Sequence, residues 1–309
     1  MSLLSHLRAV TTALLVSLNT ILFGIPVYVL AFGKLLLRGP TAQKVIARAL
    51  IRTVEGWIDG ILLIQRWMLP IRWNIDGTDD LHRDQWYFIN CNHQSWADLP
   101  ILMQTFEHRI PFYKIFAKKQ LIWLPIIGQA LWALDYPFME RYSREDLARQ
   151  PEKRGQDLEN TRRLCRRYRE APVSILNFIE GTRFTPTKHR HQQSPYRHLL
   201  RPKAGGFAFA LAALEGRIKR LLDVTIAYPE GDTRFWAYLG GRIQSIVVRV
   251  HSIDIPERFL SGDYEEDAAF REDFQRWVRD LWDAKDALLD ELQGPYKASG
   301  MVDLPPKRR

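Results

Sequence analysis

An uncharged run over residues 9–33, AVTTALLVSLNTILFGIPVYVLAFG, constrains this chain more than any other feature of its sequence. A run of this length and apolarity can cross the hydrocarbon core of a bilayer as a helix. It extends beyond the apolar stretch of a cleaved signal peptide, so we expect an uncleaved membrane anchor. Pro26 allows a kink or a re-entrant hairpin, which leaves both a spanning and a membrane-embedded helix open.

Basic residues are distributed unequally around this run. Arg8 precedes it, and the basic residues that soon follow it are Lys34, Arg38, Lys44, Arg48 and Arg52. Short loops rich in Lys and Arg favour the cytoplasmic side of a membrane. We therefore expect the rest of the chain on the cytoplasmic face.

A second apolar segment, residues 54–73, contains Glu55, Asp59 and Arg66, and these charges argue against a second membrane span. Two interpretations are open: an amphipathic helix lying in the membrane interface, or a helix packed on the soluble part of the chain. The tryptophans that would anchor the interfacial helix are Trp57, Trp67 and Trp73.

Alternating strand and helix patterns fill the remainder of the chain. The predicted strands are 71–76, 86–90, 173–179, 224–228 and 245–250, each short and apolar or β-branched. The predicted helices include 144–169, 203–214 and 267–292. This alternation predicts an α/β fold with a mixed, largely parallel sheet covered by helices.

The net charge of +9 favours anionic partners such as phospholipid headgroups or phosphorylated substrates, with a solvated basic surface as the alternative. No nucleic-acid recognition motif accompanies that charge, so we expect no nucleic-acid partner. The two cysteines, Cys91 and Cys165, show neither a metal-type spacing nor a disulfide framework. His189 and His191 lie in a basic stretch, 188–191, that we expect to be a mobile loop, and we expect no metal site.

The first chemical motif, Asn-His-Gln-Ser-Trp-Ala-Asp at residues 92–98, directly follows the strand predicted at 86–90. On a continuous helix His93 and Asp98 would be rotated about 140° apart. They can pair only if His93 lies in a turn and Asp98 lies in the first turn of the next helix. In that arrangement the imidazole can remove a proton from an alcohol, while the carboxylate fixes its tautomer.

The second motif, Phe-Ile-Glu-Gly-Thr-Arg at residues 178–183, follows another predicted strand. Gly181 allows a sharp turn, and the Arg183 guanidinium is well suited to phosphate oxygens. Arg141 and Lys118 are further candidates for phosphate contacts. A surface Glu–Arg pair is the alternative for the second motif.

In combination and order, these motifs resemble the glycerolipid acyltransferase superfamily, the PlsC-type 1-acylglycerol-3-phosphate acyltransferases. Residues 92–98 match its Asn-His-x4-Asp block, and residues 180–183 match its Glu-Gly-Thr-Arg block. Within the superfamily, CNHQSWAD, ALDYPFMERYSR and NFIEGTRF are most similar to the YihG-type bacterial inner-membrane acyltransferases.

Three further blocks are matched less closely. Phe138 and Arg141 fit the aromatic-to-arginine block, although Met-Glu stands between them where Ile-Asp is usual. Pro229 is the candidate for the proline block, although it lies at the far end of its strand. Lys118 occupies the family's lysine before a Leu-x3-Pro-x2-Gly run. These departures concern the preferred acceptor more than the reaction.

The resemblance implies acyl transfer from acyl-CoA or acyl carrier protein to the free hydroxyl of lysophosphatidic acid, without a metal or an organic cofactor. It implies that His93 is the general base and Asp98 its orienting partner. The residues that it assigns to substrate binding are Lys118, Arg141, Glu180, Gly181, Thr182 and Arg183.

Together, the residue patterns and the resemblance predict three parts of the chain: a membrane anchor with an interfacial helix (1–70), an acyltransferase catalytic domain (71–293) and a flexible basic tail (294–309). Membrane lipids are therefore expected partners, at the cytoplasmic face of a bacterial inner membrane. The alternatives are a different lysophospholipid acceptor and an inactive membrane scaffold.

Overall fold

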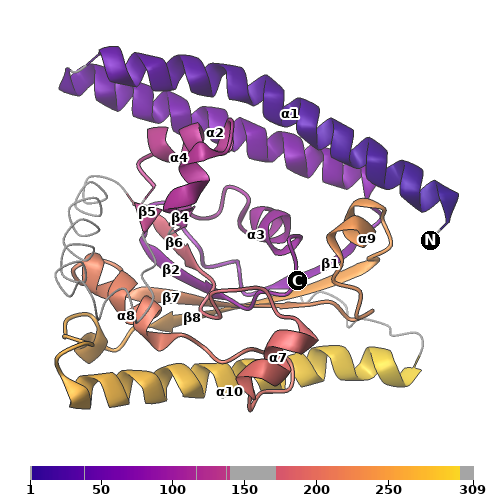
Figure 1. The fold of residues 1–309 in the computed structure, drawn as a ribbon, viewed down its shortest axis with the longest axis vertical. Helices are drawn as coiled ribbons and strands as arrows, with labels where there is room; N and C mark the ends of the chain where they lie inside the picture. Colours follow the sequence, from indigo (N-terminus) through magenta and orange to yellow (C-terminus); the bar gives the residue numbers. More distant parts are fainter. Residues whose placement is uncertain (1, 38, 116, 137, 140–171, 300–309) are drawn as a thin grey trace.

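The computed structural model describes the chain except for residues 1, 38, 116, 137, 140–171 and 300–309. Within the described residues, six strands form one sheet in the order β1-β8-β7-β2-β6-β3 (Figure 1). All neighbouring strands are parallel except β7 and β8, which are antiparallel. The strands are β1 (Arg72–Asp76), β2 (Tyr87–Cys91), β3 (Tyr113–Ile115), β6 (Ser174–Asn177), β7 (Arg220–Ala227) and β8 (Ser245–Asp254). The predicted α/β fold with a mixed, largely parallel sheet is confirmed.

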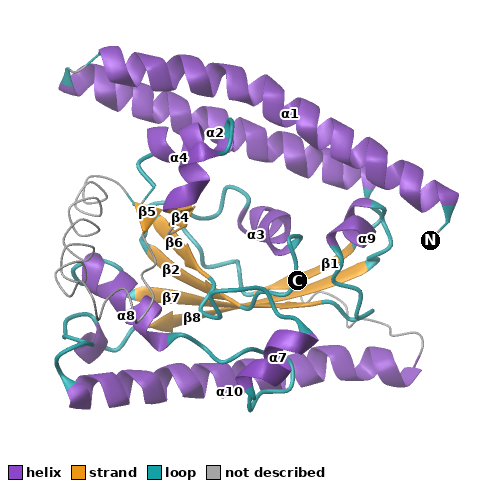
Figure 2. Ribbon diagram, viewed as in Figure 1, coloured by secondary structure: helices purple, strands orange, loops and turns teal. Residues whose placement is uncertain are grey.

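Helices cover both faces of this sheet (Figure 2). On one face, α8 (Ala204–Ala213) and α10 (Ala268–Ser299) contribute to a core that includes Phe88 of β2. On the other face, α3 (Asp98–Phe106) packs against side chains such as Ile89. Two hydrophobic cores therefore hold the sheet, one on each side.

Short elements complete the fold. They are β4 (Ala117–Lys118), the 3-10 helix η1 (Lys119–Trp123), α4 (Ile127–Ala133), β5 (Phe138–Met139), α7 (Pro186–Gln192), α9 (Phe235–Leu239) and the 3-10 helix η3 (Glu257–Phe259). β4 and β5 pair in parallel as a separate two-stranded ladder. The helix predicted at 144–169 and most of the tail predicted at 294–309 lie outside the described residues.

The first helix, α1 (Leu3–Leu36), continues without interruption through Pro26. Of the described helices, it is the one long and apolar enough to cross a membrane by length and composition, and little of its apolar stretch is buried against the rest of the chain. Leu14, Leu18 and Ile25 are among its exposed apolar side chains. The predicted apolar helix over residues 9–33 is therefore present and extends beyond both ends of that run.

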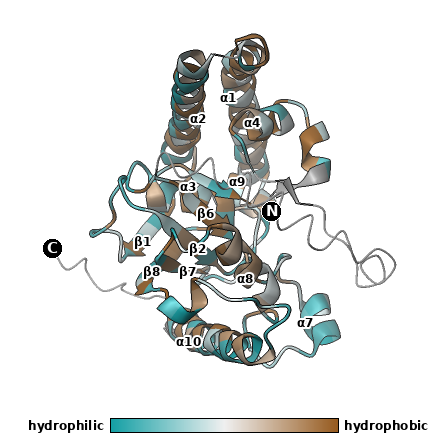
Figure 3. Cartoon of the chain, turned by 90° about the vertical axis from the view of Figure 1, so that its left-hand side faces the viewer, coloured by the Kyte–Doolittle hydropathy of each residue, from teal (hydrophilic) through white to brown (hydrophobic). Residues whose placement is uncertain are grey.

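The second helix, α2 (Pro40–Met68), lies beside α1 on the α3 side of the sheet (Figures 1 and 3). Trp57 Nε1 donates to Thr20 Oγ1 of α1 at 3.1 Å, so Trp57 contacts α1. Trp67 is 83% exposed, so its predicted contact with the membrane interface stays a prediction. The helical interpretation of residues 54–73 is wrong for its last residues, because α2 ends at Met68 and Trp73 lies in β1. The chain becomes extended at Leu69 because the next residue is a proline.

The basic stretch 188–191 is not a loop but part of α7. Thr185 Oγ1 caps this helix by accepting from Lys188 N at 3.2 Å, and Pro186 occupies its first turn. The prediction of a mobile loop was wrong because this Thr-Pro start signal was overlooked.

Candidate active site

The turn between β2 and α3 brings His93 and Asp98 together. β2 ends at Cys91, α3 begins at Asp98, and His93 lies between them. His93 Nδ1 is 2.8 Å from Asp98 Oδ2. The Asp98 side chain is fully buried, whereas the imidazole keeps 14% of its surface exposed. The contact that the strand–turn–helix context predicts is therefore present, and one edge of the imidazole remains accessible.

The Asp98 carboxylate accepts hydrogen bonds on both oxygens. Besides His93, Oδ2 accepts from the backbone N–H groups of Gln94 at 2.8 Å and Ser95 at 2.9 Å. Oδ1 accepts from the Tyr228 hydroxyl at 2.5 Å. Because an ionised carboxylate can only accept, the proton of the neutral imidazole sits on Nδ1 and leaves a lone pair on Nε2. That tautomer is the one a general base requires.

Glu180 is buried behind the same turn. Its Oε1 accepts from His93 N at 3.0 Å, and its Oε2 accepts from Leu200 N at 3.2 Å. Burial raises the pKa of Glu180 to about 8, although the two backbone donors act in the opposite direction. The alternative of a surface Glu–Arg pair is therefore wrong for this side chain. Its geometry is that of a support for the His93 backbone, and acceptor contact by Glu180 stays a prediction.

The loop after β6 is tied to the His93 turn by two further contacts. Phe178 stacks on the His93 ring, with ring centroids 4.0 Å apart and planes 18° apart. Phe184 N donates to His93 O at 2.7 Å. The imidazole is thus fixed on one face by an aromatic ring and through its backbone by the same loop.

Gly181, Thr182 and Arg183 form the part of this loop predicted to bind phosphate. Gly181 has φ +68°, a left-handed conformation that favours glycine. The Arg183 guanidinium lies over the Trp96 ring, 4.6 Å from its centroid. Lys188 Nζ donates to Thr182 Oγ1 at 2.6 Å and to Arg183 O at 3.1 Å. Two cations, Arg183 on this loop and Lys188 of α7, therefore lie together beside the segment that contacts the imidazole.

The side chains of two predicted binding residues lie outside the described structure. Lys118 ends β4, opposite Met139 of β5, and its side chain lies outside the described structure. Arg141 also lies outside the described residues. Their roles stay predictions.

Tyr228 and Asn92 have structural roles that sequence reasoning missed. Tyr228 directly precedes Pro229, yet its contact with Asp98 spans 130 residues of sequence. The Asn92 amide exchanges two hydrogen bonds with the backbone of Ile226 in β7, at 2.9 and 2.8 Å. The available signal was the position of Tyr228 at the end of a predicted strand, since parallel strands bring their carboxyl ends to one edge of a sheet.

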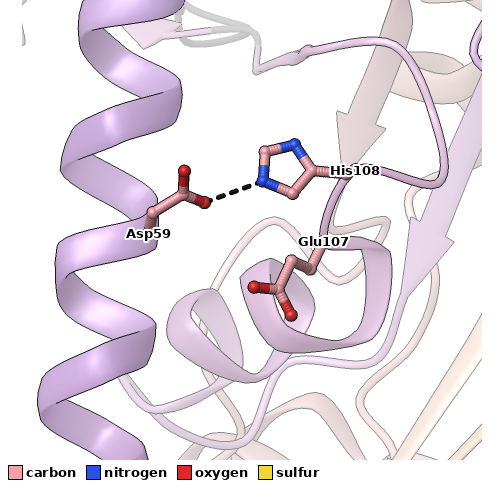
Figure 4. Close-up of side chains that lie close together, drawn as sticks. All are labelled: Asp59, Glu107 and His108. Atoms are coloured by element: carbon pink, nitrogen blue, oxygen red, sulfur yellow. Dashed lines mark hydrogen bonds and ion pairs between the residues drawn. The ribbon is translucent and has the colours of Figure 1, made fainter.

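A second histidine–carboxylate group lies elsewhere, where α2 meets the end of α3 (Figure 4). Atoms of Asp59, Glu107 and His108 approach within 4.8 Å of one another. His108 Nε2 is 2.9 Å from Asp59 Oδ1, and Glu107 pairs with Arg66 of α2 at 2.5 Å. These ion pairs join α2 to α3, and the groups are already engaged with one another.

Comparison with known proteins places the chain in a family. The Acyltransferase family model matches residues 72–229, about half of the chain. The chain is 30% identical over 200 residues to 1-acyl-sn-glycerol-3-phosphate acyltransferase gamma of Mus musculus, covering 61% of this chain and 46% of that protein. It is 25% identical over 254 residues to 1-acyl-sn-glycerol-3-phosphate acyltransferase 2 of Brassica oleracea, covering 76% of this chain and 59% of that protein.

The chain thus spans about half the length of the curated relatives it matches. A solved structure, the 1-acyl-sn-glycerophosphate acyltransferase PlsC of Thermotoga maritima, is similar with a TM-score of 0.42 and 17% identity, covering 86% of this chain and 97% of that one. The chain belongs to the Acyltransferase family, and the predicted PlsC-type superfamily is confirmed.

Proposed function

We propose that this protein transfers a fatty acyl group from a thioester donor to the free hydroxyl of a 1-acylglycerol-3-phosphate, giving phosphatidic acid. The observation that carries the proposal is the 2.8 Å contact between His93 Nδ1 and the buried Asp98 carboxylate. The names of the relatives support the choice of acceptor.

In the proposed reaction, His93 Nε2 removes the proton of the acceptor hydroxyl as its oxygen attacks the thioester carbonyl carbon. The ester C–O bond forms and the C–S bond breaks. The proton then passes from the imidazolium to the departing thiolate, which leaves as the free thiol of CoA or acyl carrier protein. Asp98 stabilises the imidazolium while it carries the proton.

This chemistry requires no metal or organic cofactor. The acceptor itself supplies the nucleophilic oxygen, and the donor thioester supplies the leaving group. The protein contributes the base and holds the two substrates together, an arrangement that lowers the entropic part of the barrier.

The acceptor phosphate is proposed to bind at the loop of residues 181–183. The guanidinium of Arg183 provides paired donors for phosphate oxygens, and Lys188 adds positive charge to the same loop. By the family resemblance, Lys118 and Arg141 add further phosphate contacts. The headgroup that this loop accepts then decides whether the product is phosphatidic acid or another phospholipid.

We propose that α1 and α2 hold the site at the cytoplasmic face of a bacterial inner membrane. α1 offers exposed apolar side chains, whereas α2, which packs along it, carries the exposed cations Lys44, Arg48 and Arg52. A perpendicular crossing by α1 would carry these charges toward the hydrocarbon core, which is costly. Attachment at the leaflet surface instead lets them contact anionic headgroups.

The test uses the full chain purified in detergent and returned to phospholipid vesicles, with acyl-CoA and lysophosphatidic acid as substrates. Replacing His93 with Ala should lower kcat/KM for phosphatidic acid formation at least about 100-fold, as expected for loss of a general base. The matched control is His108→Ala, because His108 also pairs with a carboxylate, at 2.9 Å, but lies where α2 meets α3. The mechanism is wrong if both variants retain wild-type activity.

An acceptor panel separates the remaining alternatives. Lysophosphatidic acid, lysophospholipids with larger headgroups and monoacylglycerol are compared with both acyl-CoA and acyl-carrier-protein donors. Preference for a larger headgroup would indicate a different acceptor within the same chemistry. No transfer with any acceptor would favour the scaffold alternative.

A further inference from the structure

Tyr228 contacts the proposed catalytic pair without lying on the path of the proton. It directly follows β7, is 1% exposed, and donates its hydroxyl hydrogen to Asp98 Oδ1 at 2.5 Å. Burial and the nearby Asp98 charge raise the pKa of the Tyr228 hydroxyl well above its ordinary value. The hydroxyl therefore keeps its proton and acts as a permanent donor.

The two Asp98 oxygens have different surroundings. Oδ2 accepts from His93 and from the backbone of its own turn, whereas Tyr228 is the side-chain donor at Oδ1 within the described structure. Without this donor, Oδ1 would be a buried anionic oxygen with an unmet hydrogen bond. Rotation of the carboxylate would then move its oxygens out of line with His93 Nδ1.

We propose that Tyr228 is a positioning residue: its hydroxyl fixes the orientation of the Asp98 carboxylate, so that one oxygen stays aligned with His93 Nδ1. The consequence for catalysis rests on the proposed acyl transfer, whereas the positioning itself is measurable without it.

Strand β7, which ends directly before Tyr228, is fixed on both sides. Asn92 bonds both the N–H and the C=O of Ile226, two residues before the tyrosine. On the other side of the sheet, the buried Lys285 of α10 donates to Val224 O at 2.6 Å and to Thr225 Oγ1 at 3.2 Å. The tyrosine hydroxyl therefore approaches Asp98 from a rigid support.

Loss of the Tyr228 hydroxyl would increase the proton affinity of His93. A carboxylate with fewer donors keeps more negative charge available to the imidazolium, which stabilises the charged form of His93. The pKa of His93 should therefore rise, by about half a unit to one unit if part of a charged hydrogen bond is lost. Other titratable groups around this pair are Cys91, Glu180, Arg183, Asp223, Tyr238 and Lys285. None of them is replaced in Tyr228→Phe.

The experiment compares Tyr228→Phe with Tyr238→Phe in the full chain in detergent. Tyr238 is an apt control because it is also buried, 3% exposed, and its hydroxyl donates to Gln65 Oε1 at 2.5 Å rather than to Asp98. The His93 pKa is read from NMR titration of ring-¹⁵N-labelled histidine, with His93→Gln assigning the signal. The pH dependence of kcat/KM for acyl transfer is measured in parallel.

The proposal predicts that the His93 pKa rises in Tyr228→Phe and stays at the wild-type value in Tyr238→Phe. The acid limb of the kcat/KM profile should move to higher pH by the same amount. An unchanged His93 pKa in Tyr228→Phe, or an equal rise in both variants, would overturn it. An inactive wild-type protein would contradict the proposed function alone, because the NMR titration does not depend on turnover.

Discussion

The buried carboxyl of Glu180 should make the stability of this protein fall as pH rises. Its folded-state pKa of about 8 lies above the ordinary value of 4.5 because burial disfavours the charged form. The folded state then binds a proton that the unfolded chain has already lost, and this difference destabilises the fold progressively as pH rises from about 4.5 to about 8. Over that window the change amounts to roughly 5 kcal/mol, taking about 1.4 kcal/mol per pKa unit.

The perturbation is Glu180→Gln, which keeps the shape of the side chain and cannot ionise. The free energy of unfolding is measured by urea titration with tryptophan fluorescence, at several pH values between 5 and 8.5, for the wild type and the variant. The difference between them isolates the contribution of Glu180, because other titrating groups are common to both proteins. Wild type should lose stability relative to the variant as pH rises.

A pH-independent difference would refute this reasoning. It would mean that the carboxyl is already ionised in the fold and that the backbone donors at His93 and Leu200 compensate fully for its burial. In that case Glu180 would be an anionic anchor for the His93 turn.

Three further outcomes follow from other contacts. Lys285→Met should lower the free energy of unfolding by about 3–5 kcal/mol, because it leaves the buried Asp223 carboxylate without its ion-pair partner at 3.1 Å. Adding Asp223→Asn should recover most of that loss in the same urea titration. Gly181→Ala should cost about 1–2 kcal/mol in the same measurement, because residue 181 has φ +68° and an added Cβ would lie 3.1 Å from the Lys203 side chain. Arg183→Gln should raise KM for lysophosphatidic acid about 10- to 100-fold with a smaller effect on KM for the acyl donor, as steady-state kinetics can show; equal changes in both would exclude a phosphate contact at this side chain.

The sequence predicted the contact of His93 and Asp98 because the two residues are local to one strand–turn–helix unit. A helix beginning at Asp98 directly after a buried strand leaves few ways to place the histidine of the intervening turn. The Tyr228 contact was not predictable in the same way. It depends on β7 lying next to β2, a pairing of strands far apart in sequence that local patterns do not specify.

The surroundings of α2 and of Glu180 were likewise not predictable from local sequence, because they depend on tertiary packing. Amphipathic periodicity is the same for a helix in a membrane interface and for a helix packed on its neighbours, so residues 54–73 left both possibilities open. The structure places Trp57 against α1 and leaves Trp67 exposed. For Glu180, the sequence indicated a turn but not that its side chain points inward, beneath the His93 backbone.

The most direct test of the account is a double-mutant cycle on the catalytic pair. kcat/KM for acyl transfer to lysophosphatidic acid is measured for His93→Gln, Asp98→Asn and the double variant. If Asp98 acts through the imidazole, each single variant should lose at least about 100-fold, and the double variant should be no less active than His93→Gln alone. Losses that multiply in the double variant, or a His93→Gln variant with wild-type activity, would contradict the claim that these two residues work as one base.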